Sequence, residues 1–377
     1  RDNGKKIEYT GSSTLASGVI IVLRGGDLTI DDSSTNHDGS IKSGTDAYAA
    51  IALIKKGEGE TGTAAKLTVN NGTLEGYYYA ITGNGSRHNT EITINGGTIT
   101  ATAANENLGI FHPQDGTLTI TGGTLTAYAS AVEMRAGTLN LTGGNLTATA
   151  TTYSYTANGS GSTTVGAAIA IAQHNTKKVI TTTLSGGTLN GTKTISVVDA
   201  QSNDLANVDV TATSSFVANA EVPEGFKWEE QSGGTCTLVE DKFILVDGTD
   251  YTKTADEPVA KAVYKRTFGS NRVKKYQGWF IPFDYTITAA DLQKFKFFKI
   301  DMIAHSAVPG EAGDPNKLWV HLIQLTENDV MMANKPYIFT PQEEVGQYEF
   351  ITTNATLKAL TTESVASCST TSEEFNF

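Results

Sequence analysis

The chain has 377 residues, a formal net charge of −12, two cysteines, 38 glycines and 8 prolines. An acidic chain without a basic stripe is a poor partner for nucleic acid or an anionic membrane surface, because both contacts depend on clustered Lys and Arg. No apolar run approaches the ~20 residues that a spanning helix needs, so we expect no membrane-spanning segment, and the richness in Gly and Thr favours strands and turns.

A short phrase recurs along the first half of the chain. "LTITGGTLTA" (Leu118–Ala127) has near-copies, and their separations vary from 21 to 43 residues. Variable spacing is typical of a parallel β-helix, whose strands stack while its turns lengthen by insertion. The second glycine of each copy is Gly72, Gly97, Gly123, Gly144 or Gly187, and Gly39 marks a weaker first copy.

Apolar residues recur at fixed distances from these glycines. A spacing of two on each side of a glycine turn indicates strand, turn and strand, with the apolar side chains on one face. One column comprises Val69, Ile94, Ile120, Leu141 and Leu184, and two residues before these lie Leu67, Ile92, Leu118 and Leu139, with Thr182 as the exception. A second column comprises Ile41, Leu74, Ile99, Leu125, Leu146 and Leu189, and a third comprises Ile51, Ile81, Ile110, Val132, Ile169 and Ile195. We therefore predict a three-sided, right-handed parallel β-helix of about six coils over residues 1–220.

The longest separation accommodates an inserted loop. Residues 151–166, "TTYSYTANGSGSTTVG", are rich in Gly, Ser and Thr and contain two tyrosines. This composition is typical of a surface loop, so we expect the segment to project from the coils.

The composition changes after the repeats. Residues 221–240 are expected to form a connector, after which aromatic residues and Lys become more frequent. Short apolar segments such as "AVYKRTF" and "KPYIFTP" then follow one another, joined by turn residues. This pattern predicts an antiparallel β-sandwich over residues 241–377.

Two local features of the predicted sandwich can be tested. "ITAADLQKF" (Ile287–Phe295) is the one segment with a helical pattern, and Thr288 is its expected N-cap. Trp279 and Trp319 lie in strand-like segments, and we expect both in the core because large aromatic side chains dominate the interiors of sandwiches.

Four motifs follow one another in the second half: Asp247-Gly248, Arg266-Thr267-Phe268, Trp279 with Pro282-Phe283, and Ala333-Asn334-Lys335-Pro336-Tyr337-Ile338. Together they resemble a module of surface and secreted proteins of Bacteroidetes. The resemblance implies an exported or cell-surface protein with a spacer, binding or assembly role, whose signal peptide has been removed.

Parallel β-helices often carry polysaccharide lyases and hydrolases. Such chemistry needs paired carboxylates, or a base assisted by calcium, in an open groove. The weak candidates are Asp32, and a set of His112, Glu133 and Arg135 that we expect on one edge of neighbouring coils. The non-catalytic interpretation is that Asp32 forms a turn, and that Glu133 and Arg135 form a surface salt bridge beside a solvated His112. Arg87-His88 is a further basic pair.

The sequence offers little to hold a cofactor or a metal. The segment "DLTIDDSSTNHDGS" (27–40) resembles a calcium loop but lacks the acidic twelfth position of an EF-hand, so calcium stays only an alternative. Cys236 and Cys368 form no metal motif, and they are as compatible with one disulfide as with two free thiols. We expect neither a metal site nor a cofactor.

Tyrosines give a better case for binding. Exposed aromatic rings on a rigid, Thr-rich and Asn-rich face suit stacking against sugars. The alternative is that these rings pack against the coil edges. The candidates are Tyr77, Tyr78, Tyr79, Tyr128, Tyr153 and Tyr155.

The sequence thus predicts a non-catalytic, adhesin-like protein, secreted or on the cell surface, that binds a glycan, a host or microbial surface polymer or a surface protein. A polysaccharide lyase or glycoside hydrolase is the first alternative, and a structural stalk is the second. An acidic pair or calcium cluster in an open groove would favour the enzyme, and flat, featureless faces would favour the stalk. Nothing in the sequence predicts an oligomeric state.

Overall fold

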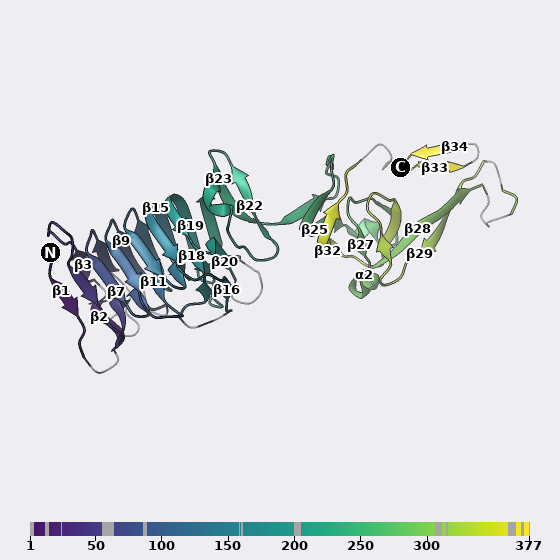
Figure 1. The fold of residues 1–377 in the computed structure, drawn as a ribbon. Helices are drawn as coiled ribbons and strands as arrows, with labels where there is room; N and C mark the ends of the chain where they lie inside the picture. Colours follow the sequence, from purple (N-terminus) through teal and green to yellow (C-terminus); the bar gives the residue numbers. More distant parts are fainter. Residues whose placement is uncertain are drawn as a thin grey trace. The chain divides into compact units, whose positions relative to one another are not determined.

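The computed structural model describes residues 4–11, 15–23, 25–54, 64–85, 89–157, 159, 161–199, 205–305, 311–313, 316–360, 367–370 and 373–376. Over these residues the protein is all-β (Figure 1). The chain divides into two compact units, Arg1–Val239 and Glu240–Phe377. Each unit has its own hydrophobic core.

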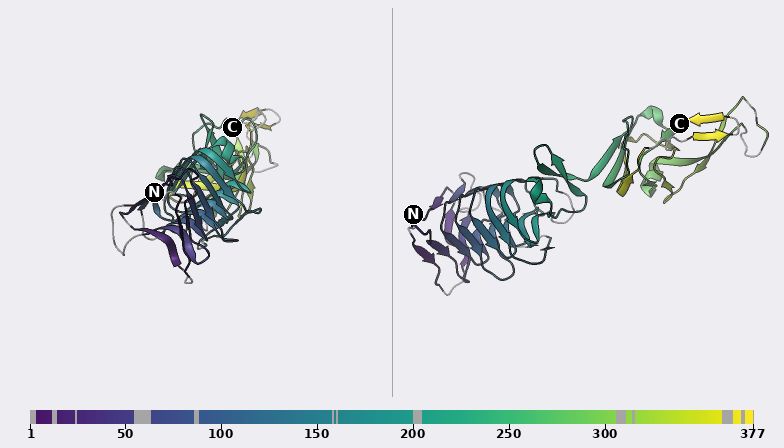
Figure 2. Two further views of the ribbon diagram at one scale, coloured as in Figure 1. Left: turned by 60° about the vertical axis from the view of Figure 1, so that its left-hand side comes forward. Right: turned by 45° about the horizontal axis from the view of Figure 1, so that its top comes forward.

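The first unit is a parallel repeat in which successive strands stack along its length (Figure 2). Its described strands form three stacks. The first comprises β3 (Asp27–Ile30), β6 (Ala65–Val69), β9 (Asn89–Ile94), β12 (Asp115–Ile120), β15 (Gly137–Ala148), β19 (Ile180–Asn190) and β21 (Val208–Thr213). The second comprises β1 (Lys6–Glu8), β4 (Ser40–Lys42), β7 (Thr73–Gly76), β10 (Thr98–Ala101) and β13 (Thr124–Ala127), followed by the second halves of β15 and β19.

The third stack is a separate parallel sheet. It comprises β2 (Leu15–Leu23), β5 (Ala47–Ile54), β8 (Tyr79–Thr82), β11 (Leu108–His112), β14 (Ser130–Met134), β18 (Ala167–Ala172) and β20 (Lys193–Val198). The first two stacks belong to one sheet because the long strands β15 and β19 run through the corner between them.

The predicted apolar columns are confirmed as strand register. Leu118 pairs with Ile92 on one side and with Leu139 on the other, and Leu125 pairs with Ile99 and Leu146. These residues are fully buried in one core. Each buried aliphatic side chain contributes about 1.5–3 kcal/mol relative to an exposed one, so the columns stabilise every coil against its neighbours.

The repeated glycines occupy the corners between the first and second stacks. Gly123 has a φ of +89°, and the other four strong copies also have positive φ. A Cβ atom on Gly123 would lie 3.0 Å from the carbonyl oxygen of Gly96 in the neighbouring coil. Glycine is therefore required both for its backbone conformation and for close approach of the coils. Gly39, the weaker copy, has no positive φ, although Ile41 two residues later pairs with Leu74 as predicted.

The parallel repeat is longer than the glycine register indicated. β2 and β3 precede the first predicted column residues, and Ile20 pairs with Ile51 in the third stack. At the other end, β21 continues the first stack, and Val210 pairs with Thr182, the one polar residue of its column.

The expected connector and the inserted loop both differ from the prediction, and one short helix completes the first unit. The expected connector, 221–240, contains β22 (Phe226–Gln231) and β23 (Thr235–Glu240), and β23 pairs antiparallel with β21, so residues 221–239 of this segment belong to the first unit. A single helical turn, α1 (Ser214–Val217), follows β21. The inserted loop contains a small hairpin, β16 (Ser154–Tyr155) and β17 (Thr164–Val165), which folds back on the unit instead of projecting from it.

The second unit contains mostly antiparallel sheets. One sheet has the order β24 (Lys242–Val246), β25 (Glu257–Phe268) and β32 (Gly346–Leu357), in which β24 and β25 pair parallel, unlike the predicted antiparallel pattern. The other has the order β26 (Gln277–Trp279), β31 (Tyr337–Pro341), β28 (Phe295–Ala304) and β29 (Trp319–Gln324). Shorter pairs are β27 (Tyr285–Thr286) with β30 (Val330–Met331), and β33 (Ser367–Thr370) with β34 (Glu373–Asn376); a 3₁₀ turn, η1, spans Ser270–Arg272.

The predicted details of the second unit have mixed outcomes. The helix α2 spans Ala289–Lys294, and Thr288 is its N-cap, as predicted; the structure adds a capping box between Thr288 and Asp291. Trp279 is 2% exposed in a cluster of aromatic rings. Trp319 is 45% exposed, so its assignment to the core is wrong. It begins β29, which is an edge strand of its sheet.

Candidate functional site

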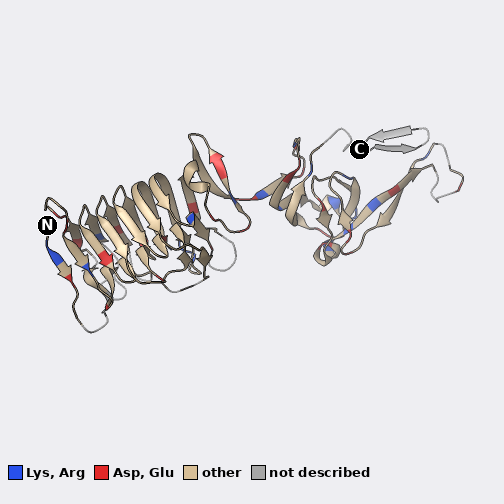
Figure 3. Cartoon of the chain, in the orientation of Figure 1, with Lys and Arg blue, Asp and Glu red and all other residues tan. Residues whose placement is uncertain are grey.

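The outer face of the third stack carries the main concentration of aromatic side chains in the first unit. Side chains alternate along a strand, so residues next to the buried column point away from the core. A row of outward positions runs in register through Ala52, Thr82, Phe111, Glu133, Ala170 and Ser196. This face combines apolar, hydroxyl and charged groups, and the stacked strands otherwise carry few charges (Figure 3).

Four aromatic rings gather at one part of this face. Tyr79 stacks on Phe111 with ring centres 5.2 Å apart, and Tyr48 lies 4.8 Å from Tyr78 and 5.8 Å from Tyr79. Tyr79 and Phe111 form a small apolar cluster outside the main core, whereas the ring of Tyr48 is 40% exposed. The cluster therefore combines two packed rings, Tyr79 and Phe111, with the solvent-accessible Tyr48.

These rings border an open groove of about 560 Å³. Its polar lining includes Thr82, Glu106, His174 and Lys178, and the backbone of Gly83 and Gly85 lies beside them. Arg135, Gly161 and Ser162 also line it. The last two belong to the inserted segment, so that segment forms part of the groove wall.

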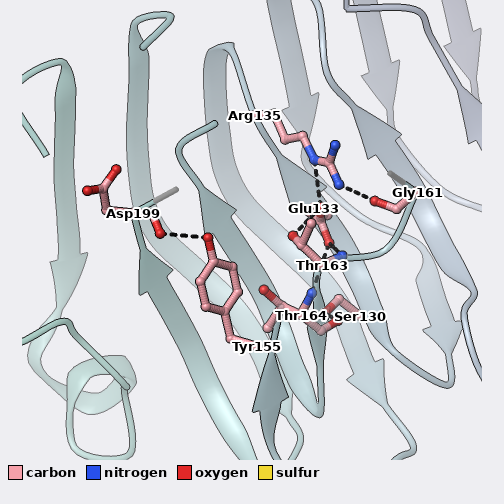
Figure 4. Close-up of polar contacts among 8 residues, drawn as sticks. All are labelled: Ser130, Glu133, Arg135, Tyr155, Gly161, Thr163, Thr164 and Asp199. Atoms are coloured by element: carbon pink, nitrogen blue, oxygen red, sulfur yellow. Dashed lines mark hydrogen bonds and ion pairs between the residues drawn. The ribbon is translucent and has the colours of Figure 1, made fainter. Parts of the chain in front are cut away.

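The inserted segment is held against the third stack by Glu133 (Figure 4). The Glu133 carboxylate is fully buried; Oε1 accepts from Thr163 Oγ1 at 2.8 Å, and Oε2 accepts from the amides of Thr163 at 3.0 Å and Thr164 at 3.4 Å. We call residues 152–157, 159 and 161–166 the strap, because β17 within them contacts β14 and β18 and Tyr153 reaches Ser196 of β20. The hydroxyls of Tyr153 and Tyr155 fasten the strap further, to Ser196 Oγ and to the carbonyl of Asp199.

Arg135 completes this buried network. Its Nε lies 2.9 Å from Glu133 Oε1, its Nη2 donates to the carbonyl of Gly161, and its guanidinium carbon lies 4.7 Å from the centre of the Phe111 ring. Arg135 is only 8% exposed. A buried ion pair is tolerated when hydrogen bonds satisfy its remaining atoms, as here. The expectation of a surface salt link is thus wrong, because the pair lies beneath the strap.

His112 does not share an edge with Glu133 and Arg135. Glu133 is in register with Phe111 on the outer face, whereas His112 is in register with Met134, whose side chain is in the core. The imidazole is fully buried, and its ring nitrogens lie 3.3 Å from Thr90 Oγ1 and 3.1 Å from the carbonyl of Ala136. Burial lowers the pKa of His112 to about 4. The expectation that His112 is solvated is therefore also wrong.

Asp32 has the geometry of a turn-forming residue. It is buried, and its carboxylate accepts hydrogen bonds from the amides of Gly4 at 2.7 Å, Ser34 at 2.8 Å and Gly39 at 2.7 Å, and from the Ser34 hydroxyl. Burial by itself would raise the pKa of Asp32, but these hydrogen bonds hold it well below its usual range. The carboxylate organises the loop between β3 and β4. Arg87-His88 lies outside the described residues.

The predicted binding tyrosines separate into two groups. Tyr78 and Tyr79 line the groove, and Tyr77 contacts Tyr78 edge to face at 4.7 Å. Tyr128, Tyr153 and Tyr155 do not line it. Burial raises the pKa of Tyr155 to about 12, which keeps its hydroxyl protonated as a donor to Asp199.

Sequence reasoning missed Tyr48 and Phe111. Tyr48 stands three residues before Ile51, as Tyr78 stands three before Ile81, and the neighbouring residues Ala49 and Tyr79 pair in register. The equal spacing of Tyr48 and Tyr78 before Ile51 and Ile81 could have predicted that the two tyrosines are neighbours. Phe111 follows Ile110 directly, and alternation along the strand places it on the outer face.

The described part of the chain contains no cluster of three or more His, Cys, Asp and Glu residues able to hold a metal ion, and no helix there is long and apolar enough to cross a bilayer. Cys236 is a buried free thiol, 3.6 Å from Ser214 Oγ. Comparison of the chain with family models, with curated protein sequences and with solved structures gives no match.

Proposed function

We propose that this chain is a non-catalytic, exported or cell-surface protein that binds carbohydrate or a similar surface polymer in the groove bordered by Tyr48, Tyr78 and Tyr79. The observation that carries the proposal is the meeting of the exposed Tyr48 and the half-buried Tyr78 with hydroxyl, amide and charged groups in one open groove of about 560 Å³. Ligand sites in proteins typically combine ring surfaces with a few placed polar groups in this way.

We also infer that the first unit is a three-sided, right-handed parallel β-helix and that the second unit is a β-sandwich. The three stacks of parallel strands support the first inference, and the facing antiparallel sheets around one aromatic core support the second. A stacked repeat is a rigid platform, which favours a binding or adhesive role for its faces.

The chemistry of the groove suits a sugar. The flat apolar face of a sugar ring can stack on Tyr48 or Tyr78, while its hydroxyls bond to Thr82, Glu106 or His174. His174 Nε2 is buried and has no hydrogen-bond partner within the described residues, so a donor or acceptor remains unsatisfied beside the groove. The strap and Arg135 hold one wall in place, which lowers the ordering cost of binding.

The experiment is a glycan array followed by titration of the best ligand against Tyr48→Ala and Tyr78→Ala. Each ring should contribute ~0.5–1.5 kcal/mol, so each variant should bind about 2–10 times more weakly. Tyr128→Ala is the matched control, because Tyr128 is a half-buried tyrosine that does not line the groove. Absence of binding to plant, host and microbial glycans, or equal affinity of all three variants, would reject the proposal.

The alternative of a polysaccharide-cleaving enzyme is less well supported. Asp32, His112 and Glu133 are each fully buried, and their polar atoms are engaged by the protein. Turnover of a polysaccharide panel that disappears in Glu133→Gln or Asp32→Asn, with the fold intact, would establish the enzyme instead. The groove also distinguishes this molecule from a featureless stalk, the second alternative.

A further inference from the structure

A second concave surface lies in the unit Glu240–Phe377, on the outer side of the sheet β26-β31-β28-β29. Gln277 and Trp279 in β26 point inward and are 7% and 2% exposed. Tyr276, Gly278 and Phe280 therefore point outward, and Tyr276 and Phe280 are 66% and 43% exposed.

Gly278 leaves a gap between these two rings. It lacks a side chain, and no atom lies within 4 Å of the position that a Cβ would take. Its cross-strand partner Ile338, on β31, forms the floor of the gap. Phe298, on β28, pairs with Ile338, and its ring centre lies 5.8 Å from that of Tyr276. The resulting slot has a volume of about 480 Å³. In an extended strand the two rings are ~13 Å apart, so a ligand that touches both must be a chain of several units.

One end of the slot carries a fixed polar group. The Asp247 carboxylate accepts from Tyr264 Oη at 2.7 Å, and its other oxygen lies 3.1 Å from Arg266 Nε. Arg266 also donates to Gln277 Oε1 at 2.9 Å and to the carbonyl of Gly278 at 3.0 Å. Asp247 is thus neutralised by Arg266 but retains lone pairs that can accept hydrogen bonds from ligand hydroxyls.

The residues around the slot are basic although the chain as a whole is acidic. Arg272, Lys274 and Lys275 precede Tyr276, and Lys335 precedes Pro336, which lines the slot. All four side chains are exposed, and the structure assigns none of them an acidic partner among the described residues. Unpaired cations beside aromatic rings complement a ligand that carries both sugar rings and acid groups.

We propose that this slot is a second binding site, specific for an anionic polysaccharide such as a polyuronate. Sugar rings stack on Tyr276 and Phe280 across Gly278, hydroxyls bond to Asp247, and acid groups meet Lys275 and Lys335. The site lies entirely within the second unit, so it does not depend on the groove of the first unit.

The test is calorimetric titration of the full chain with hexagalacturonate and with its methyl ester, which keeps the rings and removes the charge. Hexagalacturonate should bind about tenfold or more tightly than the ester, and its affinity should fall as NaCl is raised. Gly278→Val should weaken binding about tenfold or more, because the new side chain enters the open gap. Lys275→Gln with Lys335→Gln should bring the two ligands to similar affinities.

Tyr128→Ala, at a half-buried tyrosine that lines neither the first groove nor the slot, is the matched control and should leave this affinity unchanged. Tyr276→Ser is the second slot variant and decides the matter if Gly278→Val fails to fold. No binding of hexagalacturonate, equal binding of acid and ester, or full affinity in the slot variants would overturn the proposal. Loss of affinity in Tyr48→Ala alone would assign the ligand to the first groove and reject the second site.

Discussion

His112 is a neutral hydrogen-bonding side chain inside the first unit. Its two ring nitrogens meet Thr90 and Ala136, and its burial lowers its pKa from the ordinary 6.5 to about 4. Between these two values the unfolded chain binds a proton that the native protein excludes. The native state is therefore fully favoured above pH 6.5 and loses stability as the pH falls towards 4.

We expect this loss to reach ~3 kcal/mol at pH 4. Urea unfolding of the wild type between pH 7.5 and 4 should show the decrease, and His112→Gln should show a smaller one, because it has no imidazole to protonate. An identical pH dependence in His112→Gln would show that other groups cause the decrease.

Glu133 and Arg135 form a buried pair whose members depend on each other. Glu133→Ala leaves the guanidinium uncompensated beneath the strap, and removal of one partner of a buried pair costs about 3–5 kcal/mol. We expect a lower denaturation midpoint and faster proteolysis within residues 152–166. The double variant Glu133→Leu with Arg135→Met should recover much of the stability, because no unpaired charge remains. A double variant less stable than Glu133→Ala would contradict this account.

At the scale of elements, the corner glycines combine two constraints, a positive φ and close approach of the neighbouring coil, and the two can be tested separately. Gly123 and Gly225 have nearly the same φ, +89° and +88°, but only Gly123 has neighbouring backbone where a Cβ would lie. Gly225→Ala should cost ~1 kcal/mol from backbone strain alone. Gly123→Ala should cost at least ~2 kcal/mol, because the coils must also move apart. Equal losses in thermal unfolding would show that crowding is unimportant.

The elements also show what the sequence could predict. The apolar columns were predictable because spacing by two around a glycine is a local pattern that register preserves. The coil of β2 and β3 was missed because "GVIIVL" (Gly18–Leu23) and "DLTI" (Asp27–Ile30) lack the repeated glycine phrase. The position of the strap was unpredictable from composition, because it depends on a carboxylate 30 residues away in the chain.

The candidate site was predictable only in part, for a similar reason. Tyr78 and Tyr79 were found because consecutive tyrosines are conspicuous in a Thr-rich repeat, whereas Tyr48 is a single residue one coil earlier. His112 and Glu133 are only 21 positions apart in the sequence, but strand alternation sends them to opposite faces. Trp319 was misassigned because its apolar, strand-like segment did not reveal that β29 lies at the edge of its sheet.

At the scale of the whole molecule, two cores with no residue in common divide the chain at Val239. We therefore expect residues 1–239 and 240–377 to fold when produced separately. Calorimetry should give each fragment a transition within a few degrees of the corresponding one in the full chain. A fragment that is unfolded, or whose transition lies far below its counterpart, would show that the units stabilise each other.

The hairpin β22-β23 has a consequence for how such a molecule can change length. It adds to β21 in the antiparallel direction, so the parallel order of the first stack stops there. A duplicated coil joined after the hairpin would find the edge of β21 in the first stack already paired, and aggregation through the edge of β21 is blocked as well. A coil inserted between β13 and β14 would meet matching strands above and below. Evolution or engineering can thus lengthen this platform from within, while the closed end stays the same.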